Sequence, residues 1–172
     1  ALDWPTKTIR HELFEQYKAN RPKLPDNFKR QIWLIKDIIR DLNIPYVEIP
    51  WYEADDIIYT IANLYKQQAN IFIHSLDKDL KQIIDNKVVC VNPMKSEITD
   101  HNKFIQDYWF EPKYMLDYLC LLWDASDNVP WVKGIWEKTA TDLIAKYGTL
   151  QVIYDNLENV SPTIKQKLVD WK

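Results

Sequence analysis

Three short clusters of acidic residues constrain this chain more than any other feature. They are Glu53, Asp55 and Asp56 in WYEADDII, Asp77 and Asp79 in HSLDKDL, and Asp124 and Asp127 in LLWDASDNVP. Carboxylates that a fold gathers repel one another unless cations bind between them. Their oxygens suit Mg²⁺ or Mn²⁺, and two such ions about 4 Å apart favour in-line displacement at phosphorus. The clusters therefore indicate metal-assisted phosphodiester hydrolysis.

Two of the clusters follow segments that read as strands. NIFIHS (70–75) is a short apolar run typical of a buried strand, and Asp77 and Asp79 come directly after it. YVEIP (46–50) is a second candidate, followed by Glu53 at the start of a helix. Ligand sites of open α/β sheets lie at the carboxyl ends of strands. The alternative reading is that the acids only cap helices, where Asp and Glu are favoured anyway.

The order of the elements predicts an α/β fold with a parallel central sheet flanked by helices. Strands are expected at 46–50, 70–75 and 87–93, and ALD (1–3) reads as the end of another. Helices are expected at 11–20, 26–43 (with Asp26 as its N-cap), 54–68, 77–84, 101–108, 112–123 and 137–146, the last closed by Gly148, and a further helix starts from Thr149. We expect residues 1–110 to form the α/β core and residues 111–172 a helical subdomain.

Composition excludes several classes of protein. No apolar run reaches the ~18 residues that a membrane span needs, and no signal peptide is visible. Cys90 and Cys120 have no CxxC partner and read as reduced thiols of a cytoplasmic protein. The three His residues are too widely spaced for a zinc motif.

The net charge of −3 conceals an uneven distribution. Residues 5–40 hold nine Lys and Arg against four acids, while the rest of the chain holds 13 against 21. A basic arm beside an acidic metal site suits a nuclease that acts on a polyanion. A solvated helix face is the other explanation of scattered Lys and Arg.

Several motifs together resemble the 5′-nuclease family. IRHELFEQYKANRPKLP, YEADDII, DKDL, DASDNVP and GIWEKTA occur in the family's order and spacing over nearly the whole chain. The resemblance is strongest to the 5′→3′ exonuclease domain at the N-terminus of bacterial DNA polymerase I, with flap endonucleases as relatives. It implies a PIN-like nuclease core with a helical arch at about 10–30 and a helix–hairpin–helix-type element at about 127–150.

The resemblance also implies an activity and a set of site residues. The activity would be Mg²⁺-dependent (or Mn²⁺-dependent) 5′→3′ exonuclease and 5′-flap endonuclease cleavage in replication and repair, with two ions. Lys18 and Arg21 would act on the scissile phosphate, with Lys18 as the electrophilic helper. The metal-binding carboxylates would be Asp3, Glu53, Asp55, Asp56, Asp77, Asp79, Asp124 and Asp127.

DNA binding would use the arch and the hairpin element. The residues implied are Arg10, Tyr17, Lys18 and Arg21 in the arch and Val132, Gly134, Trp136, Lys138 and Thr139 in the hairpin element. The hairpin would grip duplex DNA through its backbone and a bound K⁺, which recognises structure rather than base sequence. The implied partner is DNA with a 5′ flap, nick or single-stranded 5′ end, including RNA primer–DNA, at the nucleoid. A polymerase domain in the same full-length chain is also implied.

The chain departs from the family pattern at its start, where the family has a further strand ending in a metal-binding Asp. The resemblance therefore implies an internal fragment, and it leaves two alternatives open. One is a catalytically incomplete fragment that binds DNA structures, and the other is a related structure-specific ribonuclease.

Tryptophan is the second departure. Seven of the eight Trp stand where family members usually carry Gly, and the chain has only two Gly. These seven are Trp4, Trp51, Trp109, Trp123, Trp131, Trp136 and Trp171, with Trp33 as the exception. The codon UGA is one base from both the Trp codon UGG and the Gly codon GGA. Our hypothesis is that UGA encodes glycine in the native host, and the alternative is that the Trp are genuine core or base-stacking residues.

Overall fold

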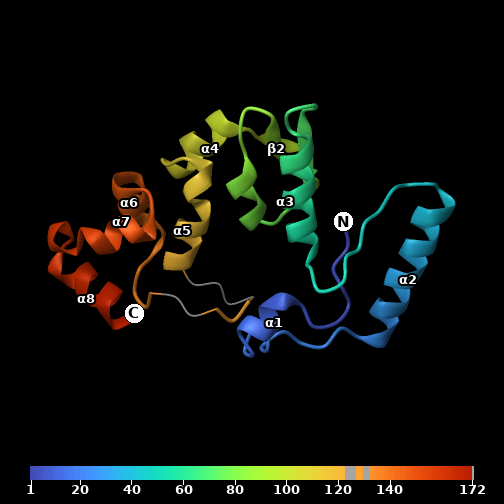
Figure 1. The fold of residues 1–172 in the computed structure, drawn as a ribbon, viewed down its shortest axis with the longest axis horizontal. Helices are drawn as coiled ribbons and strands as arrows, with labels where there is room; N and C mark the ends of the chain where they lie inside the picture. The colour runs from blue at the N-terminus through green and yellow to red at the C-terminus, as the bar shows by residue number, and fades with distance from the viewer. Residues whose placement is uncertain (123–126, 130–131, 172) are drawn as a thin grey trace. The chain divides into compact units, whose positions relative to one another are not determined.

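The structure is a computed structural model that describes residues 1–122, 127–129 and 132–171 (Figure 1). The chain divides into two compact units. In the first unit, the structure describes residues 1–60, 127 and 128. In the second unit, it describes residues 61–122, 129 and 132–171. The predicted division at residue 110 stays a prediction.

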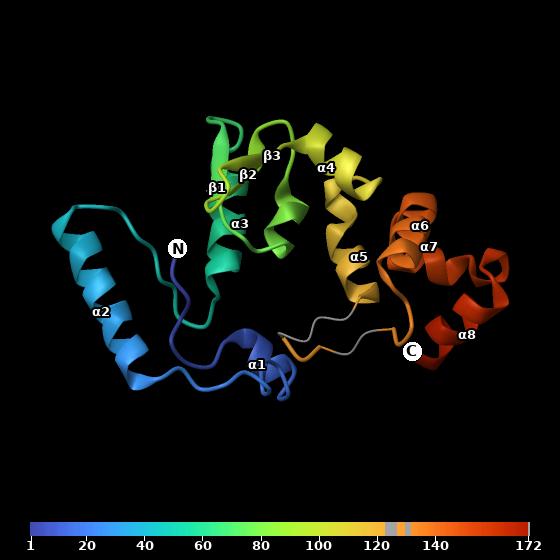
Figure 2. The same ribbon diagram turned by 180° about the vertical axis from the view of Figure 1, so that it is seen from behind.

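The sheet lies in the second unit and has three strands in the order β1 (Ile71–His74), β2 (Val88–Asn92) and β3 (Glu97–Thr99) (Figure 2). β1 and β2 are parallel, with Ile71 opposite Val88, as the α/β prediction requires. β3 pairs with β2 in the antiparallel direction. It was not predicted, because three residues (EIT) are too short to show an alternating pattern.

The two other predicted strands are wrong. Residues 1–3 and 46–50 have no strand assignment, although Leu2 N–H donates to the Val47 carbonyl at 2.9 Å. Tyr46, Val47 and Ile49 are each about two-fifths exposed, at 38, 38 and 41%. An apolar alternating segment becomes a strand only where a neighbouring strand supplies a ladder of backbone hydrogen bonds. The single bond between Leu2 and Val47 is not such a ladder.

In the first unit, helices form where the sequence predicts them but end differently. α1 (Ile9–Leu13) covers only the start of the predicted helix 11–20. Lys18 has φ 56°, and its N–H donates to the Asp127 carbonyl at 3.0 Å instead of continuing a helix. α2 (Asp26–Asp41) matches the prediction, except that Pro25 rather than Asp26 is the N-cap residue.

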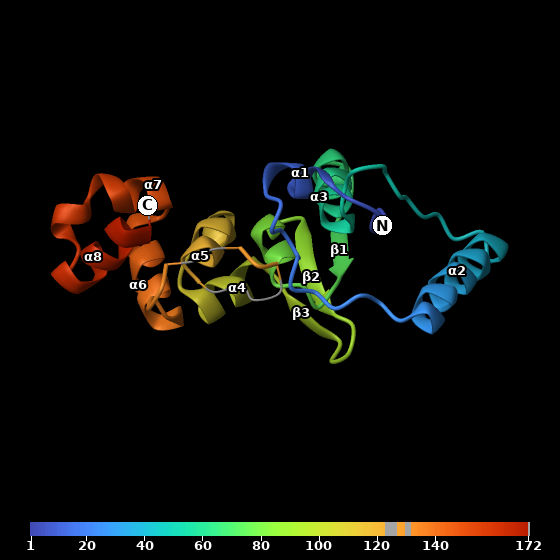
Figure 3. The same ribbon diagram turned by 90° about the horizontal axis from the view of Figure 1, so that it is seen from below.

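α3 (Ala54–Tyr65) runs from the first unit into the second, and the remaining helices follow in the second unit (Figure 3). They are η1 (Asp79–Ile83), α4 (His101–Tyr108), η2 (Pro112–Tyr114), α5 (Met115–Leu121), α6 (Glu137–Tyr147), α7 (Leu150–Asp155), η3 (Leu157–Asn159) and α8 (Pro162–Trp171). As predicted, Gly148 ends α6 with φ 80°, and Thr149 begins α7 by accepting the Val152 N–H.

Fully buried side chains from the strands and helices of the second unit form its core, among them Val88, Phe104, Leu121, Ile144 and Leu168. α5 contacts α6, and α6 contacts α7. Within the described ranges, no helix is both long and apolar enough to cross a membrane.

Two of the unusual tryptophans have backbone angles that favour glycine. Among the described residues, six that are not glycine have positive φ, and Trp51 (73°) and Trp109 (66°) are two of them. A left-handed φ is a genuine outlier for a bulky side chain. Trp109 ends α4 in the left-handed conformation typical of a C-terminal glycine, and its indole is 75% exposed, so packing does not offset the strain. Trp123 and Trp131 lie outside the described residues.

We expect Trp109→Gly to stabilise the protein. Trp109→Ala should stabilise it less, because alanine keeps the Cβ that opposes a positive φ. The left-handed conformation costs about 1–2 kcal/mol for a residue with a Cβ. Thermal unfolding of the two variants and the parent measures the difference. Trp33→Gly is the control, because Trp33 lies inside α2 and is also exposed (66%), and glycine there should destabilise the helix. Equal stability of the Gly and Ala variants would remove the backbone argument for glycine at this position.

Candidate active site

Glu53 is the centre of a group of acidic and basic side chains in the first unit. It immediately precedes α3 and is only 7% exposed. Its Oε2 accepts hydrogen bonds from Tyr17 Oη and Lys18 Nζ, both at 2.9 Å, and Thr8 Oγ1 donates to Oε1 at 3.4 Å. A buried carboxylate needs such partners, since burial without them would disfavour its charged form.

Two more ion pairs flank Glu53. Arg10 forms a bidentate pair with Asp56, with Nη–Oδ distances of 2.7 and 2.8 Å. Arg21 Nη2 lies 2.5 Å from Asp127 Oδ1. Tyr17 Oη lies 2.9 Å from Glu53 and 3.0 Å from Asp127 Oδ2, so its single hydrogen can be donated to either carboxylate. We call these seven residues the acid–base cluster: Arg10, Tyr17, Lys18, Arg21, Glu53, Asp56 and Asp127.

The cluster shifts the pKa of three of its members, raising those of Arg10 and Tyr17 and lowering that of Asp56. The hydrogen bond from Arg10 holds the pKa of Asp56 below its ordinary value, and the Glu53 N–H adds to this. Burial raises the pKa of Tyr17 far above the ordinary tyrosine value, and its hydrogen bond to Glu53 raises it further. Tyr17 therefore remains a neutral donor, and Asp56 a charged acceptor, at neutral pH.

We expect Asp56→Asn to lower the free energy of unfolding at pH 7 by about 1 kcal/mol, a modest value because both partners are partly exposed (41 and 28%). The folded pKa of Asp56 is lowered, so its contribution is present above the unfolded value of about 3.9 and is lost as the pH falls through the folded pKa. Urea unfolding at pH 7 should therefore show a lower free energy of unfolding for the variant than for the parent. At pH 3 this difference should close. Asp37→Asn, which breaks the exposed Asp37–Arg40 pair, is the control and should show almost no gap. A gap of equal size at both pH values would contradict this account.

The predicted metal ligands at the start of α3 have the right chemistry for a hard divalent cation, since they offer only carboxylate oxygens. Asp3 Oδ1 accepts the Ala54 N–H at 2.7 Å, which brings Asp3 to the segment that carries Glu53, Asp55 and Asp56. In the part of the chain that the structure describes, however, no three acidic, His or Cys side chains form a group that could hold a metal. Basic side chains engage Glu53 and Asp56 instead, and a metal ion would compete with them.

Asp77 and Asp79 lie in the second unit, just after the carboxyl end of β1 as predicted. Asp77 is exposed, and its Oδ1 accepts the Asp79 N–H at 2.9 Å. It lines a cavity of about 450 Å³ together with Ser75, Lys81, Asn92 and Lys103. The side chain therefore faces open space at the edge where ligands of α/β sheets bind. Asp124 lies outside the described residues.

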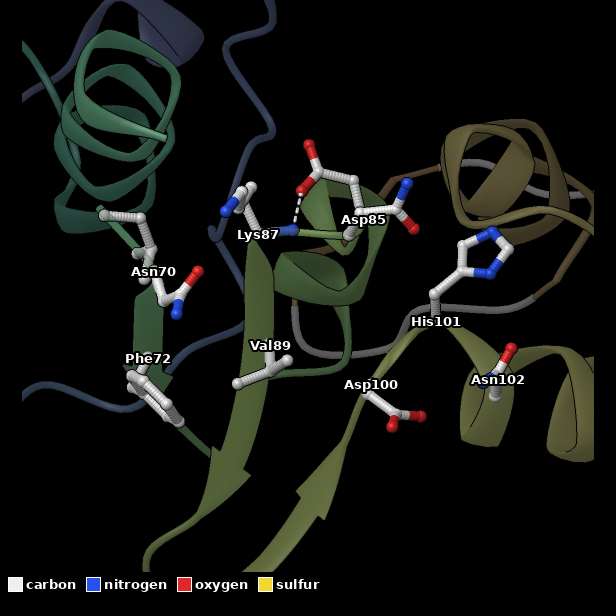
Figure 4. A pocket seen from close by; sticks show the side chains of 10 residues that line it. Asn70, Phe72, Asp85, Lys87, Val89, Asp100, His101 and Asn102 are labelled. Carbon is white, nitrogen blue, oxygen red and sulfur yellow. Dashed lines mark hydrogen bonds between the residues drawn. The ribbon is translucent and has the colours of Figure 1, made fainter. Parts of the chain in front are cut away.

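A second cavity, of about 360 Å³, opens at the other edge of the sheet (Figure 4). Asn70, Asp85 and Lys87 line it at the amino ends of β1 and β2, and Asp85 Oδ1 accepts the Lys87 N–H at 2.7 Å. None of the predicted site residues lines this cavity, so it is not a candidate active site.

The predicted hairpin element forms a tight turn before α6. Val132 and Ile135 are buried, at 0 and 3% exposure, and Ile135 N–H donates to the Val132 carbonyl at 3.1 Å. The Val132 side chain thus belongs to the core, and only its backbone remains for a ligand. Trp136 and Lys138 are exposed and Thr139 is partly exposed, at the N-terminal end of α6. This end carries amide N–H groups and a positive dipole, which suit a phosphate.

One member of the site escaped prediction from sequence. Thr8 is 3% exposed and contacts Glu53 across 45 residues. Its only sequence signal is its position just before α1, where it caps the helix and bonds His11 Nδ1 at 3.0 Å.

Comparisons with known proteins agree with these observations. The family model described as "5'-3' exonuclease, N-terminal resolvase-like domain" matches residues 1–109, and that of the "5'-3' exonuclease, C-terminal SAM fold" matches residues 110–172. A 5'-3' exonuclease of Aquifex aeolicus is 41% identical over 158 residues, covering 91% of this chain and 55% of that protein. The thermostable DNA polymerase I of Thermus thermophilus is 36% identical over 168 residues, covering 97% of this chain and 20% of that protein.

The fold also resembles a solved structure, the bacteriophage T5 D15 flap endonuclease in a pseudo-enzyme–product complex with DNA and metal ions. The TM-score is 0.78 at 19% sequence identity, over 94% of this chain and 65% of that one. The chain spans about half the length of the curated exonuclease that it matches. Both family models, which together match residues 1–172, lead to one conclusion: the chain belongs to the 5′-3′ exonuclease family.

Proposed function

We propose that this chain is the nuclease part of a 5′→3′ exonuclease and 5′-flap endonuclease that hydrolyses DNA phosphodiesters in replication and repair. Family membership supports the proposal, as do relatives that are 5'-3' exonucleases and a DNA polymerase I. The observation that carries it is the contact between Lys18 and Glu53, because a lysine cation, which can bind phosphate, lies there beside a carboxylate of metal-ligand type. This is the juxtaposition that phosphoryl chemistry uses.

The roles of the residues follow from this arrangement. Arg10, Lys18 and Arg21 would leave their carboxylate partners for the phosphates of an incoming 5′ strand. Glu53, Asp56 and Asp127 would then be released. Together with Asp3, Asp55, Asp77, Asp79 and Asp124 they would hold two Mg²⁺ or Mn²⁺ ions. Bound ions of this kind supply activated water and stabilise negative charge as it develops.

Duplex DNA would be bound by the turn at 132–136 and by Lys138 and Thr139. Gly134, with φ 82°, lets the backbone approach the phosphates closely, and a K⁺ ion at the hairpin would assist. We place the protein in the cytoplasm, at the nucleoid, where it would meet 5′ flaps, nicks and primer ends. A polymerase domain in the full-length chain is part of the proposal, since one relative is a DNA polymerase I.

A panel of end-labelled substrates tests this function. We expect cleavage of a 5′-flap DNA duplex in Mg²⁺, none in EDTA, and little cleavage of a 3′-flap duplex of the same sequence. Tight binding of the 5′ flap without cleavage in Mg²⁺ or Mn²⁺ would instead show a DNA-structure-binding protein. Preferential cleavage of structured RNA would show a ribonuclease.

A further inference from the structure

The turn before α6 is anchored on both sides and has a glycine at its centre. Val132 and Ile135 anchor it in the core, and between them Gly134 has φ 82°, a conformation in which glycine is hardly restricted. The neighbouring side chains of Lys133 and Trp136 are exposed. The turn can present a preorganised surface to a ligand only if a contact fixes the orientation of its central peptide.

Lys167 supplies such a contact from α8. Its Nζ donates to the Gly134 carbonyl at 2.7 Å, across 33 residues of sequence. A Cβ at Gly134 would lie 3.1 Å from both Cε and Nζ of Lys167, so the end of the lysine side chain packs directly against the glycine. The next residue, Leu168, is fully buried, which fixes this part of α8 in the core.

The bond constrains the orientation of the whole peptide. The carbonyl of Gly134 and the N–H of Ile135 belong to one plane and point in opposite directions. Lys167 holds the carbonyl, and the Val132 carbonyl accepts the N–H at 3.1 Å. With both ends of this peptide bonded, the path of the backbone into the first turn of α6 is set.

We propose that Lys167 is a positioning residue for DNA binding, which acts by holding the Gly134 carbonyl and so preorganises the turn for duplex phosphates. This inference rests on the proposed function of the turn. The ammonium donates to a backbone carbonyl of the protein, and the inference assigns Lys167 to the turn rather than to a phosphate, a distinction that the salt dependence of binding tests. No local sequence motif marks it.

The test is the affinity of the 172-residue chain for a 5′-flap DNA duplex in EDTA, measured by fluorescence anisotropy at several salt concentrations. We expect Lys167→Met to weaken binding about tenfold, the equivalent of one charge-assisted hydrogen bond. The dependence of affinity on salt should stay unchanged. A lysine that contacts phosphate would behave differently, since its removal reduces the salt slope by about one.

Matched variants separate positioning from general effects of charge. Lys165→Met removes a lysine of the same helix, paired with Glu158 at 2.6 Å, and should bind as the parent does. Lys167→Arg keeps a charged donor and should restore most of the affinity. Amide hydrogen exchange at Ile135 should be faster in Lys167→Met, even without DNA. If Lys167→Met does not fold, Lys167→Ala provides the same comparison, because it also removes the donor.

Three results would overturn the inference. They are parent-like affinity of Lys167→Met, an equal loss in Lys165→Met, and a reduced salt slope in Lys167→Met. Failure of the proposed function would look different, because the parent chain itself would then not bind the flap duplex.

Discussion

Asp77→Asn is expected to slow cleavage of a 5′-flap duplex by about 10³-fold without lowering the stability of the fold. A metal ion supplies several kcal/mol of charge stabilisation in such a reaction, and each 1.4 kcal/mol corresponds to a factor of ten in rate. The fold should tolerate the change because Asn keeps the Oδ1 that accepts the Asp79 N–H, and because the side chain is exposed. Single-turnover cleavage rates and thermal unfolding measure the two quantities.

Asp85→Asn is the matched control at the opposite edge of the sheet. Burial alone would raise the pKa of Asp85, but hydrogen bonds from the Lys87 N–H and from Lys66 outweigh burial and lower it. The substitution should therefore cost up to about 1 kcal/mol of stability, because it removes the partly exposed ion pair with Lys66. It should leave cleavage unchanged. Parent-like cleavage by Asp77→Asn, or an equal loss in both variants, would contradict the assignment of Asp77.

Lys18→Met is expected to reduce the cleavage rate at saturating substrate by about 10²–10³-fold, the usual effect of removing one group that stabilises transition-state charge. The structure makes this lysine unusual, because the left-handed backbone at φ 56° and the bond from its N–H to the Asp127 carbonyl fix the base of its side chain. A positioned cation loses less entropy when it engages a phosphate. Lys18→Arg should recover only part of the rate, since the guanidinium differs in shape from the ammonium.

Lys23→Met is the control for Lys18, since Lys23 is an exposed lysine in the same basic arm. It should weaken DNA binding slightly, in proportion to the lost charge, and leave the rate at saturation unchanged. If both variants raised KM with no change in kcat, Lys18 would serve only to attract DNA, and its role at the scissile phosphate would be wrong.

Local signals in the sequence predicted much of the fold correctly. NIFIHS became β1 because Ile71, Phe72 and Ile73 are apolar or β-branched and pair with β2, with Ile73 buried. Gly148 and Thr149 end one helix and begin the next, as their conformational preferences require. YVEIP has the same local character as NIFIHS but lacks a ladder of neighbours. Strand formation depends on a distant partner, which a local pattern does not contain.

All seven residues of the acid–base cluster are among the predicted site residues, but their pairing was not predicted. Sequence identified Glu53, Asp56 and Asp127 as acids of one site and assigned them all to metal ions. The structure pairs each with a basic or hydroxyl group, through contacts that span 35 to 110 residues. Opposite charges brought close by a fold engage each other, and no spacing rule predicts which pairs will form over such distances.

At Trp51 and Trp109 the backbone favours glycine although the sequence has tryptophan. Protein from the native host can decide whether these and the other unusual tryptophans are decoded as glycine. We expect the tryptic peptide Gly134–Lys138 (GIWEK) to carry glycine in place of Trp136, and the peptide 104–113 to carry glycine in place of Trp109. Tryptophan at both positions, established by peptide mass, would instead show that the native protein tolerates an exposed indole at a left-handed C-cap.

The most direct test of the central claim is the single-turnover cleavage rate of a 5′-flap DNA duplex as a function of Mg²⁺ concentration. If carboxylates of this chain hold two catalytic ions, the rate should be negligible in EDTA and should rise more steeply than in proportion to Mg²⁺ before it saturates. A cleavage rate that is independent of Mg²⁺ would contradict the account, and so would tight binding of the flap with no cleavage at any Mg²⁺ or Mn²⁺ concentration.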